Sequence, residues 1–314
     1  MKTILLQLLL MAPMALWSQT YMTVTYTKGK VHYYAPQQKN PTSIYPGLSL
    51  SSEGKIQCEP DSKVKLLCKG KIYEYTDSKL HSLDEIARQA NNSSSLSFIG
   101  RFWNFLTGSM DGTEDATHLQ QHHEKSMESL RAGIKGYGSK EFEIQANLMY
   151  EGKLSNEEVT FMWSPDMDTP FCFQLSRQAD DEVIMVAWTK ENYLSLKLAD
   201  LTLSSGEAYE WQIITSKTDP KAPHSRKMQF VYDPEAAAKA LSQLKAQSAY
   251  ESASKTEQTL MELYTFETNS FYYDAYLGYQ QLIGENPDDV LVKRAYAAFL
   301  ARIDKMDEAQ SMIK

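Results

Sequence analysis

Two histidines in the polar stretch THLQQHHE have the spacing best suited to chemistry. His118 and His122 are four residues apart, so they would share one helix face, with Glu114 or Asp115 about one turn earlier. Imidazole and carboxylate groups placed in this way could hold a divalent cation. The stretch lacks the HExxH order in which a glutamate activates water between two ligands. We interpret the pair as part of a solvated linker, and we expect neither a metal nor a cofactor.

The common catalytic signatures do not occur in this sequence. It contains no G-x-S-x-G nucleophile elbow, no P-loop and no G-x-G-x-x-G before a helix. Paired acids such as Asp180-Asp181 and Asp288-Asp289 lie in predicted turns, where carboxylates cap helices and interrupt strands. We therefore expect no catalytic residue, and the sequence favours a protein that is not an enzyme.

Three cysteines are too few for a disulfide scaffold, and their positions predict buried thiols. Residues 59–62 form a predicted turn between two strands, which would place Cys58 opposite residue 63 or 64 and out of register with Cys68. Neither cysteine has a CxxC partner or a nearby histidine, so a zinc site is not expected. We interpret both as small apolar side chains of a core, and Cys172 as a thiol outside any disulfide.

The first residues have the pattern of a secretory signal peptide. Residues 1–18 carry one lysine, an apolar run and then small or polar residues. No later stretch approaches about 18 uninterrupted apolar residues, so we expect no membrane span. The 40 acidic residues exceed the 32 basic ones, which argues against a nucleic-acid surface. We therefore predict an exported protein, periplasmic or secreted.

The pattern along the chain predicts a multidomain β + α protein. Short alternating strands with frequent turns predict a small N-terminal β domain over residues 21–85. A helical connector or linker is expected over 86–140, because this part is largely polar. Strand patterns return over 141–232 and predict a β-sandwich. Residues 233–314 are predicted to be helical and begin with an N-cap aspartate followed by proline.

A set of turn and core positions runs through the first of these regions: Gly29, Val31, Pro46-Gly47-Leu48, Lys55-Ile56, Asp61-Ser62, Val64, Leu66, Gly70, Ile72-Tyr73, Leu80 and Leu83. Over about residues 24–85 this pattern resembles the FecR-type β domain of bacterial envelope regulators. The resemblance implies a Gram-negative source and hence the periplasm. Regulatory members carry a membrane span before this domain, whereas this chain has a predicted signal peptide, so only the fold is carried over.

Within residues 141–232, an early Trp163-x-Pro165 is followed by an alternating strand and a late Tyr209-x-Trp211. This order resembles a fibronectin type III or immunoglobulin-like sandwich, which uses such residues in its inward-facing core. No cysteine pair bridges the sheets, which favours the fibronectin-like version. Such domains serve as spacers or binding modules, so the resemblance implies a fold rather than an activity.

An internal repeat lies in the C-terminal region. Leu263, Phe266, Ala275 and Tyr279 are matched 34 residues later by Ala297, Leu300, Ala309 and Ile313. This spacing resembles two degenerate tetratricopeptide units over about residues 256–314. Two units are fewer than the three usually needed to bury a core. The helix over 233–250 and a binding partner are therefore the two candidates for the missing cap.

Residues 96–106 combine apolar and aromatic side chains at helical spacing. Leu96, Ile99, Phe102, Trp103 and Leu106 would line one face. We expect this helix to pack its aromatic face on the N-terminal β domain. A weak contact with a membrane surface is the alternative, although the polar face holds few of the basic residues that interfacial helices use.

These patterns favour an exported, non-enzymatic protein that binds or scaffolds other proteins in the cell envelope. Tyr272, Tyr273 and Tyr276 are the candidate partner contacts, because FYYDAY is richer in aromatics than one buried face requires. Packing on the sandwich is the alternative for these tyrosines. A FecR-like envelope sensor or regulator is a second interpretation of the chain. Binding to the cell wall or a polysaccharide, through an exposed aromatic such as Trp188, is a third.

Overall fold

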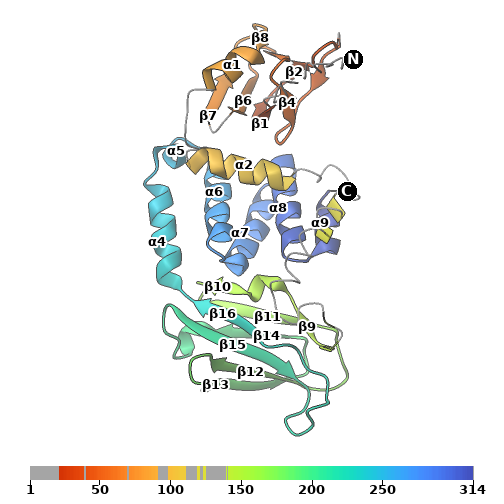
Figure 1. The fold of residues 1–314 in the computed structure, drawn as a ribbon, viewed down its shortest axis with the longest axis vertical. Helices are drawn as coiled ribbons and strands as arrows, with labels where there is room; N and C mark the ends of the chain where they lie inside the picture. The colour runs from red at the N-terminus through yellow and green to blue at the C-terminus, as the bar shows by residue number, and fades with distance from the viewer. Residues whose placement is uncertain are drawn as a thin grey trace, which may run out of the picture. The chain divides into compact units, whose positions relative to one another are not determined.

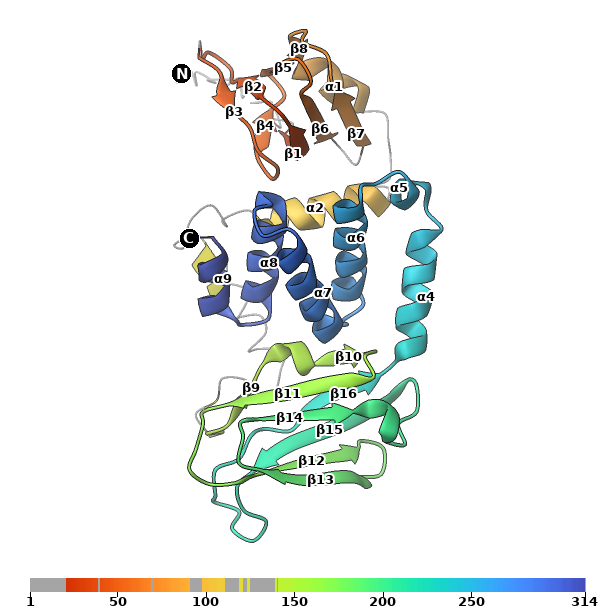
Figure 2. The ribbon, with the colours of Figure 1, turned by 180° about the vertical axis from the view of Figure 1, so that it is seen from behind.

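The computed structural model describes residues 21–38, 40–68, 71–90, 98–110, 119–120, 123–124, 139 and 141–313. The chain divides into two compact units, residues 1–96 and residues 97–314, drawn from opposite sides in Figures 1 and 2. Within the described residues both units contain antiparallel sheets, and eight α-helices are present, most of them toward the C-terminus. The mixed β and α class with a helical C-terminal stretch is therefore confirmed. The predicted signal peptide, residues 1–18, lies outside the described residues.

Two four-stranded antiparallel sheets and one helix make up the described part of the N-terminal unit. The strand orders are β4-β1-β6-β7 and β3-β2-β5-β8. The elements are β1 (Tyr21–Lys28), β2 (Val31–Tyr34), β3 (Thr42–Ser43), β4 (Ser49–Ser51), β5 (Lys55–Cys58), β6 (Lys63–Cys68), β7 (Lys71–Tyr75), β8 (His81–Ser82) and α1 (Leu83–Ala90).

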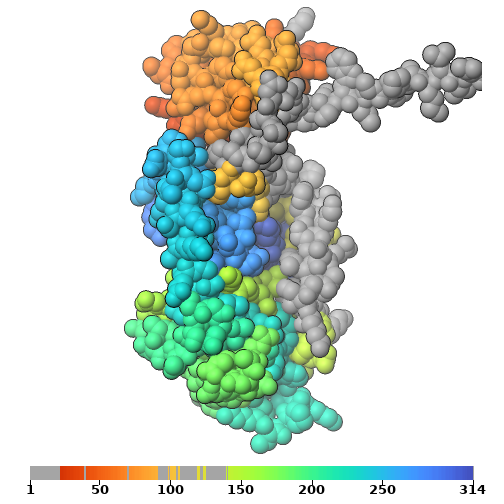
Figure 3. Space-filling view, turned by 60° about the vertical axis from the view of Figure 1, so that its left-hand side comes forward, coloured from red at the N-terminus to blue at the C-terminus, as the bar shows by residue number. Residues whose placement is uncertain are grey.

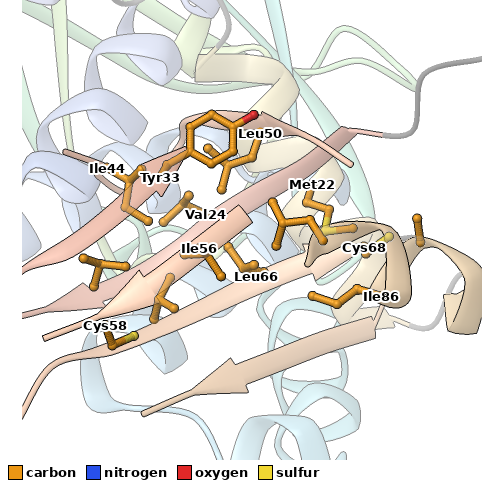
Figure 4. Close-up of a cluster of buried hydrophobic side chains, with 14 of the residues drawn as sticks. Met22, Val24, Tyr33, Ile44, Leu50, Ile56, Cys58, Leu66, Cys68 and Ile86 are labelled. Atoms are coloured by element: carbon orange, nitrogen blue, oxygen red, sulfur yellow. The ribbon is translucent and has the colours of Figure 1, made fainter. Parts of the chain in front are cut away.

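Side chains from both sheets and from α1 form one buried cluster (Figure 4). Ile56 on β5 and Leu66 on β6 are fully buried, and burial alternates along β5, as expected for a strand with one face inward. Cys58 and Cys68 belong to this cluster, Cys172 is buried in the second unit, and none of the three forms a disulfide. The prediction that Cys58 and Cys68 are core residues is confirmed, and Cys172 is a free thiol as expected.

The expected pairing of the two cysteine-bearing strands is wrong. β5 pairs with β2 and β8, whereas β6 pairs with β1 and β7, so the two strands lie in different sheets. In the turn between them Asp61 has a φ of 61°, and the Ser62 hydroxyl accepts a hydrogen bond from the Lys30 N–H at 2.9 Å. A Cβ on Gly29 would come within 2.4 Å of Ser62 Oγ, so this close approach requires glycine. The turn is thus tied to the start of β2, and the chain leaves it toward the other sheet.

The second unit contains two sheets that pack face to face, here called the sheet pair. The larger has the order β10-β16-β15-β12-β13 and is antiparallel except for β10 with β16, and the smaller has the order β14-β11-β9. The elements are β9 (Gln145–Ala146), η1 (Leu148–Tyr150), β10 (Gly152–Leu154), β11 (Glu158–Ser164), β12 (Phe171–Arg177), β13 (Val183–Thr189), β14 (Tyr193–Lys197), η2 (Leu198–Asp200), β15 (Glu207–Ile214) and β16 (Met228–Tyr232).

Aromatic side chains fill the space between these two sheets. Phe161 on β11 lies 5.2 Å from Phe173 on β12 and 4.8 Å from Trp211 on β15, measured between ring centroids. All three side chains are buried. Two antiparallel sheets whose inner faces interdigitate in this way share one core.

Among the elements whose bounds the described residues define, α2 (Phe98–Met110) precedes the sheet pair in the sequence. The helices that follow it are α4 (Pro234–Lys245), α5 (Ser248–Glu251), α6 (Lys255–Thr268), α7 (Tyr272–Glu285), α8 (Val290–Arg302) and α9 (Met306–Met312). In Figure 3 the surface of α4, in cyan, continues into that of the sheet pair, in green. The predicted start of α4 is confirmed, because Asp233 is the N-cap and accepts a hydrogen bond from the Ala236 N–H at 3.1 Å.

Helices α6 and α7 form one pair in the sequence, and α8 and α9 form the next. Helix α8 is buried over most of its length. α7 and α9 begin at Tyr272 and Met306, which are 34 residues apart. Ala275 and Ala309, the small residues of the internal repeat, are fully buried. Every side chain of α8 from Arg294 to Ala301 is also buried. A helix that is buried on every face needs protein around its whole circumference.

Polar contacts in the first turn of α7 fix this helix to the sheet pair. Asp274 is 5% exposed and accepts hydrogen bonds from the Ser155 N–H at 3.3 Å, from Asn156 Nδ2 at 2.8 Å and from the Ser155 hydroxyl. The Tyr273 hydroxyl accepts one from the Thr160 N–H at 3.0 Å. Because these donors lie on β11 or just before it, the helices and the sheets form one unit.

We expect Tyr273→Phe to lower the free energy of unfolding by about 1–3 kcal/mol, because it leaves the Thr160 N–H without its acceptor. Tyr272→Phe is the matched control, since among the described residues the Tyr272 hydroxyl makes no hydrogen bond. Urea denaturation of both variants measures the difference. Equal losses in the two variants would contradict the assignment.

Asp274 should make the stability depend on pH. Burial raises the pKa of its carboxyl above the ordinary 3.8, and hydrogen bonds from Ser155 and Asn156 oppose this rise only in part. The folded protein therefore holds the proton more tightly than the unfolded chain does. The resulting stabilisation is complete below the ordinary value and is lost as pH rises through the raised one.

We expect this loss over the pH interval above the ordinary value of 3.8 in the natural chain, and we expect it to be absent from Asp274→Asn. Denaturation of both proteins across that interval measures it as a difference, which cancels the titration of other carboxylates. A difference that does not change with pH would show that Asp274 does not titrate there.

Candidate functional site

The three tyrosines predicted as partner contacts lie at the start of α7. Tyr273 and Tyr276 are 5% and 6% exposed, and Tyr272 is partly buried. The Tyr276 hydroxyl accepts a hydrogen bond from Gln280 Nε2 at 2.9 Å, and Lys305 Nζ lies 5.2 Å from its ring centroid. Tyr273 packs against the sheet pair, which is the alternative that the sequence left open. In this structure Tyr273 and Tyr276 are therefore enclosed within the second unit.

The aromatic residue predicted as a glycan contact lies on β13, at the edge of the larger sheet. Trp188 is 52% exposed, and Val183 and Val186 on the same strand are 61% and 40% exposed. Trp188 lies opposite Cys172 of the neighbouring strand β12. The next residue of β12, Phe173, points into the core. Because side chains alternate along a strand, Cys172 and Trp188 lie on the outer face of the sheet. Among the described strands β13 pairs with β12 alone. The outer face of β13 is thus an exposed apolar surface that could receive a ligand.

Helix α2 lies across α6 and α8 (Figure 1). The rings of Phe98, Phe102 and Phe105 all contact Tyr264 of α6, with centroid distances of 5.8, 5.6 and 4.9 Å. Trp103 is fully buried. The expectation that this aromatic face is covered by the N-terminal β domain is therefore wrong, because the apolar surface of α6 and α8 covers it instead. The alternative of a membrane-surface contact stays a prediction.

The surface beneath α2 contains an ion pair whose carboxylate is buried. Arg302 at the end of α8 donates from Nε and Nη2 to Glu267 Oε2 of α6, at 3.1 and 2.6 Å. The Tyr279 hydroxyl donates to Glu267 Oε1 at 3.0 Å, and burial raises the pKa of Tyr279 well above its usual value, so the hydroxyl keeps its proton. The Arg302 guanidinium lies 4.9 Å from the ring centroid of Phe105, a cation–π contact. We call the surface formed by Tyr264, Glu267 and Arg302 the α6–α8 face.

The sequence of α2 makes it a poor helix on its own. Its 13 residues, FIGRFWNFLTGSM, include two glycines, an asparagine, a serine and a threonine. Isolated helices shorter than about 12–15 residues are marginal in water, and each interior glycine costs about 1 kcal/mol relative to alanine. Burying a large apolar side chain contributes about 1.5–3 kcal/mol. The helical state of α2 therefore depends on its aromatic contacts with the α6–α8 face.

A histidine next to the pair His118 and His122 contacts the same group of helices. His118 and His122 lie outside the described residues, whereas His123 is described. His123 Nε2 lies 3.1 Å from Asp304 Oδ1, and Nδ1 lies 3.0 Å from the Ala301 carbonyl oxygen. These contacts place His123 at the C-terminal end of α8, where the helix dipole favours donors and cations.

The described side chains offer surfaces rather than a cluster of reactive groups. Across the described ranges, no group of three or more His, Cys, Asp or Glu side chains is placed to hold a metal ion. Burial raises the pKa of the Cys58 and Cys172 thiols, which disfavours the thiolate that a nucleophile needs. No helix in the described part of the chain is long and apolar enough to span a bilayer.

No protein-family model matches this sequence, and no curated protein shows significant similarity to it. The α6–α8 face and the outer face of β13 are the two described surfaces to which a binding function can be assigned.

Sequence reasoning did not single out Tyr264, Glu267 or Arg302. The apolar face of α2 is a local pattern and is visible in the spacing of its aromatic residues. The Glu267–Arg302 pair joins positions 35 residues apart, and local spacing does not specify which charges meet. The one available signal is that Arg302 stands at the end of an otherwise mostly apolar helix.

We expect Arg302→Ala to lower the free energy of unfolding by about 3 kcal/mol, because Glu267 is 4% exposed and would be left without its charged partner. Lys245→Ala is the matched control, since the exposed Lys245–Glu262 pair should contribute less than about 1 kcal/mol. Guanidinium denaturation of the two variants provides the comparison. A loss for Arg302→Ala no larger than for Lys245→Ala would show that the ion pair is not a structural element of the face.

Proposed function

We propose that this chain is an exported, non-enzymatic protein-binding or scaffolding module of the cell envelope, and that its binding surface is the α6–α8 face. The observation that carries the proposal is that this face already holds an amphipathic aromatic helix, α2, through Tyr264 and Arg302. Docking an amphipathic helix on an apolar surface is a recurrent mode of protein recognition. Tyr and Arg are also the residue types most enriched at energetically important contacts.

The proposed architecture consists of a FecR-like β domain, a fibronectin-like sandwich and a tetratricopeptide-like tail. Two features of the second unit support it. The Tyr209 hydroxyl accepts a hydrogen bond from the Ser204 N–H at 2.8 Å, a contact that resembles the tyrosine corner of such sandwiches. The starts of α7 and α9 differ by the 34-residue period. The predicted signal peptide and the FecR resemblance support a periplasmic location.

A photo-crosslinking phenylalanine analogue at position 264, introduced into the full chain in its own host, tests the proposal. We expect a crosslink to a partner protein that maps to a helix bearing aromatic residues. The same analogue at position 239, on the exposed side of α4, should not give this product. If position 264 crosslinks only to α2 of the same chain, protein binding at this face is refuted.

Glycan binding is a second candidate function, favoured by the 52% exposure of Trp188. An exposed indole on a flat sheet offers a stacking surface for a sugar ring. We expect retention on peptidoglycan or polysaccharide resin to be lost in Trp188→Ala and kept in Tyr193→Ala, whose aromatic ring is similarly exposed on the smaller sheet. Equal retention of the two variants would remove Trp188 from consideration.

A further inference from the structure

We propose that α2 is a built-in competitor for the partner helix, so that the α6–α8 face is occupied within the chain until a helix of matching chemistry replaces α2. This inference rests on the proposed function, because it concerns access to the same surface. It adds the regulation of the site and the chemical class of its ligand.

The floor of the face is complete without α2. Glu267 receives its hydrogen bonds from Arg302 on α8 and from Tyr279 on α7, so the three groups hold one another in place. None of these hydrogen bonds involves a residue of α2. We therefore expect Arg302 to keep its hydrogen bonds to Glu267 when α2 leaves, and to remain available to another aromatic ring.

The described contacts of α2 with the face are made by side chains. Three phenylalanines surround the single ring of Tyr264, and the last of them, Phe105, also lies over Arg302. Arg101 makes a hydrogen bond to the Tyr264 hydroxyl. Another helix with the same side-chain spacing and better helix-forming residues would make these contacts with less loss of conformational entropy.

The spacing of these residues defines the class of partner. Phe98, Phe102 and Phe105 stand at positions i, i+4 and i+7, with Arg101 at i+3. The matching ligand is an amphipathic helix of another protein with aromatic residues at i, i+4 and i+7 and a basic residue at i+3. The aromatic residue at i+7 would stack on Arg302. A helix with a polar face at these positions would leave the apolar side of α8 exposed to water.

A fluorescent peptide with the sequence of residues 98–110 is the probe, and its anisotropy is measured against the full chain. The natural protein is compared with Phe102→Ala, which weakens α2 and leaves the face intact. If the face is free in about 1% of molecules, its apparent affinity is reduced by about 100-fold. We therefore expect Phe102→Ala to bind the peptide at least about tenfold more tightly than the natural chain does.

Two further variants and one control peptide keep the test interpretable. Phe105→Ala is milder, because it removes one ring that is only partly buried, and it should give a smaller increase in affinity. Leu175→Ala creates a cavity in the sheet pair, away from α2, and should leave the affinity unchanged. The peptide with serine in place of all three phenylalanines should bind none of the proteins.

Each outcome supports or overturns the inference. Tighter binding by both α2 variants supports it. Equal affinity for the natural chain and Phe102→Ala overturns the competition by α2 but leaves the proposed binding face standing. No binding to any variant overturns both proposals. If Phe102→Ala or the natural chain forms dimers in which α2 is exchanged, measured by size-exclusion chromatography with light scattering, the ligand is a second copy, which overturns the assignment to another protein.

Discussion

Helix α8 imposes the constraint on which the second unit depends, because it is apolar around most of its circumference and must be covered on every side. Its neighbours in sequence, α7 and α9, supply part of this cover. Helix α2, which precedes the whole sheet pair in the sequence, also packs on α8. In a longer repeat array the next repeat would occupy such a position. In this chain a helix from a distant segment of the sequence occupies that position. The α6–α8 face is therefore a surface that requires a helix, whichever helix that is.

Two kinds of contact hold the helices of this unit, and they differ in how replaceable they are. The first turn of α7 is held by directional hydrogen bonds to the buried carboxylate of Asp274, and moving it would leave charged and polar groups without partners. α2 is held largely by aromatic surface, which is less directional and can be matched by other apolar side chains. The contact between α7 and the sheet pair is therefore specific, whereas the contact between α2 and α8 could be made by another helix.

Local patterns in the sequence were sufficient for some features and insufficient for others. The cap at Asp233, the buried alanines of the repeat and the buried cysteines follow from residue type and periodicity, and the structure contains them. The pairing of β5 was wrong, because a turn that looks like a hairpin connection carries the chain into another sheet. The prediction that the N-terminal β domain covers the aromatic face of α2 was also wrong. Choice of partner between distant elements depends on tertiary packing, which spacing along the chain does not encode.

The three buried thiols allow the opening of each unit to be measured separately. Cys58 and Cys68 lie in the core of the first unit, and Cys172 is buried on the outer face of the larger sheet in the second unit. A thiol that is shielded in the folded state reacts with an alkylating reagent only when its surroundings open. The labelling rate at each position therefore records how often that unit opens, without any added probe.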